Sequence, residues 1–168
     1  MLPTHITNPR PILHMQRALV ALCLLSLLGC SSIPSRQWKM ETILTKTPRF
    51  NGGQLILGPQ DEYSHLELEL LRTSSGLYLY LNLLFLSTNP CLEQAGNRSI
   101  EILLEGEAPS IIEAYSLAGG GRLLFPEETA NRLISALLNN SSFTLRIGQR
   151  QLLVIPDNFT PLYERLLS

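Results

Sequence analysis

Strict alternation of apolar and polar residues between positions 65 and 83 limits most strongly what this chain can fold into. Residues 65–70 read HLELEL, and residues 77–83 read LYLYLNL. Because successive side chains of a strand point to opposite faces, each run predicts a strand with its leucines on one face. The polar link at residues 73–76 ends in glycine, so the two strands are predicted to form a β-hairpin.

Further short apolar runs predict more strands, and glycine-containing segments separate them as turns. The predicted strands lie at residues 54–57, 100–104, 110–117 and 122–125, and the turns at residues 51–53, 105–107 and 119–121. A parallel pair needs a crossover of about a dozen residues or more, so strands this closely spaced favour antiparallel neighbours. The glycines at 119–121 precede another strand, which favours a turn over a phosphate-binding loop.

The last third of the chain changes from period two to the period of a helix. Pro126 suits the first helical turn, and Glu127 and Glu128 favour its positive end. An apolar stripe follows at Ala130, Leu133, Ile134, Leu137 and Leu138. Residues 143–147 and 151–155 predict a second hairpin, and a final helix follows Asp157. The sequence therefore predicts an α+β fold, with an antiparallel β-sheet or small sandwich covered by two C-terminal helices.

Composition excludes two broad classes of protein. The chain has 168 residues, of which 45% are hydrophobic and 16% charged, so it is too apolar for a disordered protein. Thirteen basic side chains face fourteen acidic ones. This balance leaves no basic surface of the kind that binds nucleic acid, and no nucleic-acid partner is expected.

An apolar run at residues 18–28, preceded by Arg10 and Arg17, marks the N-terminal part of the chain. A transmembrane helix needs about 20 such residues, so the run is too short to span a bilayer. It matches instead the apolar region of an export signal. Met15 would give this signal a shorter basic region of ordinary length, which makes it a candidate for the true start.

The apolar run ends in Leu27-Leu28-Gly29-Cys30, which resembles the lipobox of bacterial lipoproteins. In that family the cysteine sulfur receives a diacylglycerol, the signal is cut before the cysteine, and the new amino group is usually acylated, with chains such as palmitate. The resemblance implies a signal peptide at residues 1–29, cleavage between Gly29 and Cys30, and lipidation of Cys30. An ordinary cleaved signal that contains a cysteine, or a buried apolar helix, is the alternative interpretation.

The same resemblance predicts the location and the organisation of the mature chain. Ser31, rather than aspartate, follows the cysteine, which implies delivery to the outer membrane with the domain facing the periplasm. Residues 30–37 are the expected tether, and residues 38–168 the single globular domain. Residues 120–167 also resemble the C-terminal half of several small envelope proteins of unknown or accessory function.

Candidate catalytic groups are few. Cys23, Cys30 and Cys91 are the chain's cysteines, so no disulfide is expected within one mature chain. His65 is predicted to be a solvent-facing strand residue, with Ser64 on the opposite face, which argues against a catalytic triad. Cys91 is predicted to be a structural thiol; a nucleophile or an intermolecular disulfide is the alternative.

Glu67 and Glu69 share one face of a predicted strand, about 7 Å apart from the strand rise, a spacing that glycosidases use. Such pairs are common on solvated sheet faces, and that interpretation is preferred. Histidine and cysteine are too sparse for a metal cluster of recognisable spacing. No catalytic, cofactor-binding or metal-binding residue is therefore predicted, and no cofactor is expected.

Arg72, Tyr78 and Tyr80 form a candidate partner-binding face, because tyrosine and arginine are enriched at interfaces. The favoured hypothesis is a non-enzymatic envelope lipoprotein that is held in the bilayer by acylated Cys30 and binds another envelope protein as an assembly accessory. A periplasmic module that binds a small ligand or peptidoglycan is the alternative. A hydrolase that uses Cys91 or the Glu67/Glu69 pair is the third hypothesis.

Overall fold

The computed structural model describes residues 37–47, 51–59, 64–84 and 96–168. The chain divides into two units, residues 1–33 and 34–168, and all described residues belong to the second unit. The predicted signal, Cys30 and Cys91 lie outside the described residues. Within the described residues, no helix is both long enough and apolar enough to cross a membrane.

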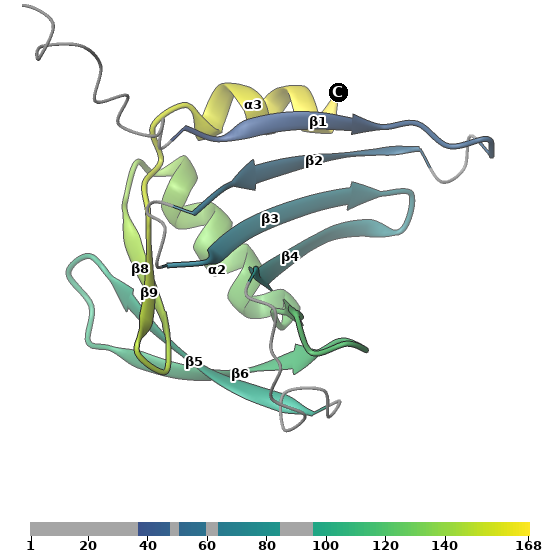
Figure 1. The fold of residues 1–168 in the computed structure, drawn as a ribbon. Helices are drawn as coiled ribbons and strands as arrows, with labels where there is room; N and C mark the ends of the chain where they lie inside the picture. Colours follow the sequence, from purple (N-terminus) through teal and green to yellow (C-terminus); the bar gives the residue numbers. More distant parts are fainter. Residues whose placement is uncertain (1–36, 48–50, 60–63, 85–95) are drawn as a thin grey trace, which may run out of the picture. The chain divides into compact units, whose positions relative to one another are not determined.

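Nine strands of the described chain form one antiparallel sheet (Figure 1). They are β1 (Lys39–Ile43), β2 (Gly52–Leu57), β3 (Leu66–Thr73), β4 (Gly76–Leu83), β5 (Asn97–Leu104), β6 (Ser110–Ser116), β7 (Arg122–Leu124), β8 (Phe143–Ile147) and β9 (Arg150–Val154). Their order across the sheet is β1-β2-β3-β4-β7-β6-β5-β8-β9. The predicted antiparallel α+β fold is confirmed, and the strands form one sheet rather than a sandwich of two.

The first four strands follow one another both in the chain and in the sheet. The predicted hairpin is confirmed as β3 and β4, in which Leu68 pairs with Leu81 and Leu70 pairs with Leu79. All four of these leucines are buried on one face of the sheet. The alternation of the sequence therefore sets both the register and the buried face of this hairpin.

The other five strands are not in chain order. The short strand β7 lies between β4 and β6, and β5 pairs with both β6 and β8. The turn from β6 to β7 needs backbone with positive φ at Gly119 and Gly120, at 92° and 67°. Only glycine adopts such angles readily, which explains the glycine run at this turn.

The sheet bends along its length, so that strands distant in its order come together. β9 contacts β3, although five strands lie between them in the order of the sheet. Figure 1 shows β8 and β9 crossing the ends of the first strands rather than continuing alongside them. The bend gives the sheet an inner face, which carries most of the core, and an outer face.

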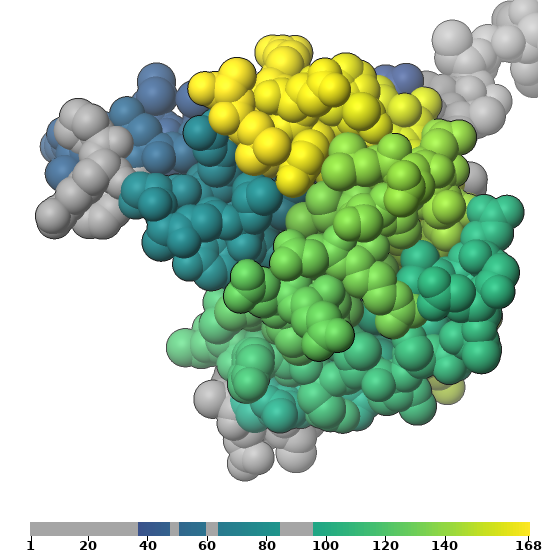
Figure 2. Space-filling view, turned by 180° about the vertical axis from the view of Figure 1, so that it is seen from behind, coloured from purple at the N-terminus to yellow at the C-terminus, as the bar shows by residue number. Residues whose placement is uncertain are grey.

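Two helices of the described part of the chain pack on the inner face. Helix α2 (Glu127–Leu138) contacts β4 and buries four residues of the predicted stripe, Ala130, Leu133, Ile134 and Leu137, whereas Leu138 is 40% exposed. Helix α3 (Phe159–Leu167) contacts β1, β2 and α2. Figure 2 shows α2 in green and α3 in yellow on adjacent parts of this side of the molecule. The predicted helix start at Pro126 is confirmed, with two glutamates in the first turn.

Trp38 fastens the start of the domain to its C-terminal segment. Its indole Nε1 donates a hydrogen bond of 3.0 Å to the carbonyl of Ile155. Its backbone N–H donates to the Asn158 side chain at 2.9 Å, and the Asn158 amide donates back to the Trp38 carbonyl at 3.0 Å. The Trp38 ring also packs on Phe159, with ring centroids 4.9 Å apart.

Candidate functional site

Three neighbouring strands carry tyrosine and leucine side chains on the outer face of the sheet. Tyr80 of β4 pairs with Leu124 of β7, and Leu124 pairs in turn with Tyr115 of β6. Cross-strand partners lie on the same face, so these three side chains form one row. Tyr78 and Arg122 lie two residues before Tyr80 and Leu124 and share their face. We name these five residues the tyrosine face.

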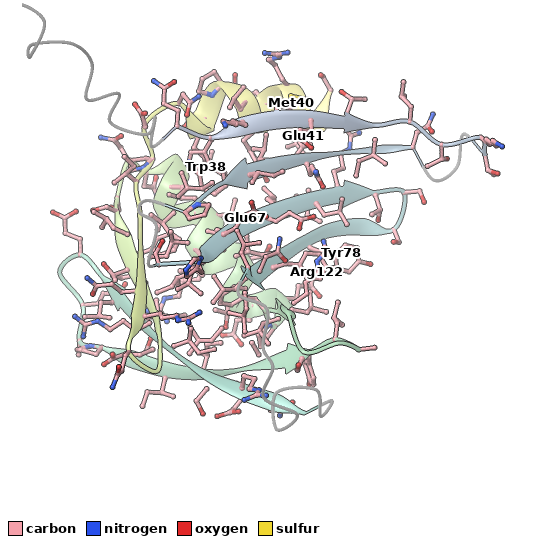
Figure 3. All side chains as sticks on the ribbon, in the orientation of Figure 1. Trp38, Met40, Glu41, Glu67, Tyr78 and Arg122 are labelled. Carbon is pink, nitrogen blue, oxygen red and sulfur yellow. The ribbon has the colours of Figure 1, made fainter. Side chains whose placement is uncertain are left out.

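The members of the tyrosine face contact one another. The rings of Tyr78 and Tyr80 have centroids 6.4 Å apart, and the Arg122 guanidinium carbon lies 3.8 Å from the centroid of the Tyr80 ring. This distance is within the range of a cation–π interaction. Tyr115 is 57% exposed. Figure 3 labels Tyr78 and Arg122 in this part of the sheet.

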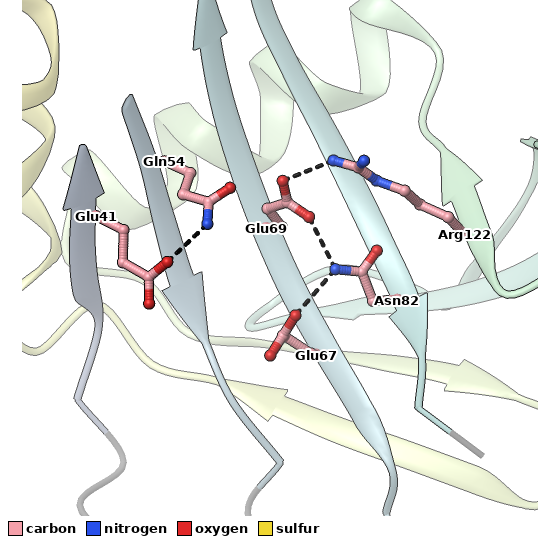
Figure 4. Close-up of polar contacts among 6 residues, drawn as sticks. All are labelled: Glu41, Gln54, Glu67, Glu69, Asn82 and Arg122. Carbon is pink, nitrogen blue, oxygen red and sulfur yellow. Dashed lines mark hydrogen bonds and ion pairs between the residues drawn. The ribbon is translucent and has the colours of Figure 1, made fainter. Parts of the chain in front are cut away.

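A polar network holds Arg122 in place beside the tyrosines (Figure 4). Glu69 receives a hydrogen bond of 2.6 Å from the Arg122 guanidinium on one carboxylate oxygen and one of 2.8 Å from Asn82 on the other. The same Asn82 nitrogen donates to Glu67 at 2.9 Å. Glu69 is only 7% exposed although it lies on the outer face. The network therefore covers a charge and orients the arginine.

The pKa of the Tyr80 hydroxyl lies above its ordinary value of 10.0. Partial burial, which disfavours the phenolate, is the largest cause. The negative charge of Glu69 and the neighbouring Tyr78 raise the pKa further, whereas the positive charge of Arg122 partly opposes them. The tyrosine face therefore presents Tyr80 in its neutral, hydrogen-bonding form at ordinary pH.

A hollow of about 290 Å³ adjoins the tyrosine face where β7 leads into α2. Tyr78, Tyr115 and Leu124 line one part of it, and the β3–β4 turn and the start of α2 line the rest. The tyrosine face therefore has a recess beside Tyr78 and Tyr115.

The structure separates the three residues of the predicted partner-binding face. Tyr78 and Tyr80 lie together on the outer face, as predicted, but Arg72 lies on the inner face. Arg72 pairs with Leu77 in the hairpin, and its guanidinium donates a hydrogen bond to the carbonyl of Leu166 in α3. Grouping Arg72 with the tyrosines was therefore wrong, because its position continues the leucine alternation of β3.

The sequence did not predict that Tyr115, Arg122 and Leu124 belong to this face. The strands that carry them were predicted, but their neighbours in the sheet were not. Local alternation gives the face on which a side chain lies, whereas the pairing of β7 with β4 joins segments distant in the chain. Sequence patterns contain no signal for that pairing.

The structure also describes the residues that were considered as catalytic or metal-binding groups. Glu67 and Glu69 share the outer face, as predicted, and one Asn82 nitrogen bridges them. His65 precedes β3, is half-buried and has a φ of 44°, so its predicted place on the strand was wrong. Ser64 is buried in the turn before it. Among the described residues, no three histidine, cysteine, aspartate or glutamate side chains are grouped to hold a metal ion.

No protein-family model, curated protein or solved structure matches this chain. Two features of the chain itself therefore bear on its function. One is the residues gathered on the tyrosine face, and the other is the lipobox-like motif that ends at Cys30.

Proposed function

We propose that this chain is a lipid-anchored protein of the bacterial cell envelope whose folded domain binds another envelope protein. The observation that carries the binding role is the tyrosine face, and the anchor rests on the motif at Cys30. The protein acts as an assembly accessory rather than as an enzyme. Its domain faces the periplasm, and the outer membrane holds its acylated cysteine.

The composition of the tyrosine face supports protein binding. Tyrosine and arginine are over-represented among residues that dominate binding energy, because they combine large apolar area with a polar tip. Ile111, which is 73% exposed, lies on the same face of β6 as Tyr115 and extends the apolar surface. The network around Glu69 fixes Arg122 before any partner arrives, which lowers the entropic cost of binding.

The anchor proposal rests on Leu27-Leu28-Gly29-Cys30 and the short apolar run before it. One acyl chain gives only marginal membrane attachment, and several chains on one cysteine hold a protein firmly. An anchored domain meets envelope partners in two dimensions, so a modest interface is sufficient for association. Anchor and tyrosine face thus support the same role.

Site-specific photo-crosslinking in cells tests the binding role. A photoreactive residue at position 115 should give a discrete crosslinked product, and Arg122→Ala in the same chain should reduce that product at least several-fold. The same group at position 164, an exposed site on α3, is the control. Identical products from positions 115 and 164, or no effect of Arg122→Ala, would contradict the proposal.

Metabolic labelling with a clickable fatty acid tests the anchor. The wild-type protein should take up the label and fractionate with the outer membrane, and Cys30→Ala should lose both properties. Cys91→Ala is the matched control and should keep both. An unlabelled wild-type protein would refute the lipid anchor while leaving the tyrosine face open to a free periplasmic role.

Binding of a small ligand or of peptidoglycan is the second candidate, and the hollow of about 290 Å³ beside Tyr78 and Tyr115 favours it. Aromatic rings next to polar groups are typical of ligand pockets, and the volume of this hollow lies just below their usual range of about 300–1,000 Å³. Cosedimentation with purified peptidoglycan, compared between the wild type and Tyr115→Ala, separates this candidate from protein binding.

A further inference from the structure

The strand β7 is shorter than its neighbour β4, and this leaves part of the β4 edge without a neighbouring strand. Three residue pairs join the two strands, and the pair closest to the start of β4 is Tyr80 with Leu124. Beyond Leu124 the chain leaves the sheet and enters α2 through Pro126. Proline has no N–H to donate to a neighbouring strand, so the pairing ends here. On this side, the first residues of β4 are paired with no described strand.

The backbone groups of Leu77 and Leu79 point to this unpaired edge. The carbonyl of Leu79 accepts a hydrogen bond of 3.0 Å from the N–H of Phe125, so the Leu79 backbone faces away from β3. Alternate residues of an antiparallel strand bond to the same side, so the N–H and carbonyl of Leu77 face away from β3 as well. The partner of Leu77 in β3 is Arg72, and its carbonyl is directed at β2, where a side chain on Gly52 would collide with it. The β3 side therefore shows the same alternation.

These backbone groups have no hydrogen-bond partner in the described part of the chain. No other described residue bonds to the N–H or carbonyl of Leu77 or to the N–H of Leu79. The two residues are about 7 Å apart along the strand. Unpaired backbone groups at a strand edge are a template for another extended segment. In such β-strand addition, backbone hydrogen bonds supply affinity, and pockets for alternate side chains supply specificity.

The hollow of about 290 Å³ lies at this same edge, since the two leucines line it together with Tyr78 and Tyr115. Two further lining residues, Phe125 and Ala130, are buried and apolar. Side chains of an added strand would point alternately toward these buried residues and toward the tyrosines of the outer face. The hollow therefore supplies the pocket that strand addition needs beside the unpaired backbone.

The charged groups at the hollow are acidic. Glu127 lines it and Glu128 follows in the chain, and both are exposed in the first turn of α2. The positive end of the helix favours their ionised form, but no described basic side chain pairs with either of them. Arg122 of the tyrosine face is already paired with Glu69. The hollow therefore suits a segment that carries a basic residue beside its apolar one.

We propose that the partner of the tyrosine face binds through an extended, basic segment, which adds to the unpaired edge of β4 as a short strand. The segment pairs with the backbone of Leu77 and Leu79 and places an apolar side chain in the hollow. A lysine or arginine next to that side chain pairs with Glu127. This inference rests on the protein-binding role proposed above, and it names the part of the partner that is bound.

Peptides selected from a library of random linear sequences on the full-length chain are the probes for this site. The selected peptides should contain lysine or arginine next to an aliphatic residue. Glu127→Gln should weaken their binding several-fold in fluorescence anisotropy, because it removes the charge opposite the basic residue. Glu164→Gln, at an exposed position of α3, is the matched control and should leave binding unchanged. A library without a binder that depends on Glu127 would overturn the proposal.

Backbone methylation of a selected peptide distinguishes strand addition from other ways of filling the hollow. Each copy of the peptide carries one N-methyl group, which removes one hydrogen-bond donor. Affinity should fall about tenfold or more at every second position of the bound part and remain at the positions between, because alternate N–H groups face the sheet. Loss of affinity without this period of two would also overturn the proposal. Crosslinking from position 115 that persisted in that case would retain the protein-binding role, so the two proposals fail separately.

Discussion

The two faces of the β3–β4 hairpin carry entirely different side chains, although neighbouring residues of each strand lie on opposite faces. Leu68, Leu70 and Leu81 on the inner face are fully buried, while Glu67 and Tyr78 on the outer face are half-buried. The inner face is uniform, and any of its leucines contributes in the same way, by removing apolar area from water. The outer face is made of different groups, each with its own partner.

This difference shows that the outer face carries defined contacts between its side chains. A solvated sheet face needs no defined contacts between its side chains, yet here one carboxylate is covered and hydrogen-bonded on both oxygens. Apolar packing stabilises the side chains of the inner face, whereas hydrogen bonds hold the polar side chains of the outer face in place. Substitutions on the two faces should therefore differ in both the size and the kind of their effects.

The largest expected effect is on the inner face. Leu68→Ala should lower the free energy of unfolding by about 2–5 kcal/mol, because it removes a fully buried side chain and leaves a cavity in a packed core. Urea denaturation followed by circular dichroism measures the change. Leu71→Ala, on the outer face of the same strand and half-buried, is the matched control and should cost clearly less. Equal losses would remove the contrast between the faces.

A smaller effect is expected from the covered carboxylate of the outer face. Glu69→Gln should lower the free energy of unfolding, measured by urea denaturation, by about 1–3 kcal/mol. The substitution removes the charge opposite Arg122 and turns an amide group toward the Asn82 donor. Glu67→Gln should cost less, since Glu67 is half-exposed and the structure gives it one hydrogen bond, from Asn82. If the two variants lost equal stability, the network would not be centred on Glu69.

Alkaline pH should produce a smaller change that depends on Tyr80. Its pKa is raised in the folded state, chiefly by burial, so the folded protein holds the phenolic proton more tightly than the unfolded chain. The resulting stability is fully present below the unfolded pKa of about 10 and is lost as pH rises through the folded pKa. Tyr80→Phe should show a shallower alkaline decline in urea denaturation. Identical declines in the two proteins would contradict this prediction.

The smallest effect on stability is expected at Tyr115, the most exposed of the described tyrosines. Tyr115→Ala should change the free energy of unfolding by no more than about 0.5 kcal/mol, since the side chain is 57% exposed. The same substitution should abolish the crosslinked product expected from a photoreactive group placed at Ile111. A variant that kept full partner binding would separate Tyr115 from the binding surface.

Local patterns predicted the approximate positions of both helices and of eight of the nine described strands, including the β3–β4 hairpin. The leucine alternation of residues 66–83 was sufficient because it contains both the period and the turn. β1 was not assigned as a strand, because the sequence KMETI lacks a clear period. The predicted second hairpin is confirmed as β8 and β9. The placement of β7 beside β4 and of β5 beside β8 went unpredicted, because these two pairings join segments distant in the chain.

The candidate site could be predicted only in part for the same reason. Tyr78 and Tyr80 were found from their own strand, whereas Tyr115 and Arg122 join them through pairings of β7. The mistake at Arg72 was avoidable, since Leu66, Leu68, Leu70 and Arg72 share one parity. The alternation of β3 already predicts that Arg72 lies on the inner face, even though arginine is a residue type enriched at interfaces.

The attachment of Trp38 to the C-terminal segment has a mechanical consequence. Any tension applied to the domain from its N-terminal side enters at this residue, which is bonded to Ile155 and Asn158 and packed on Phe159. The load therefore divides between β1, which follows Trp38 in the chain, and the segment that leads into α3. The strands that carry the tyrosine face, β4, β6 and β7, make none of these contacts.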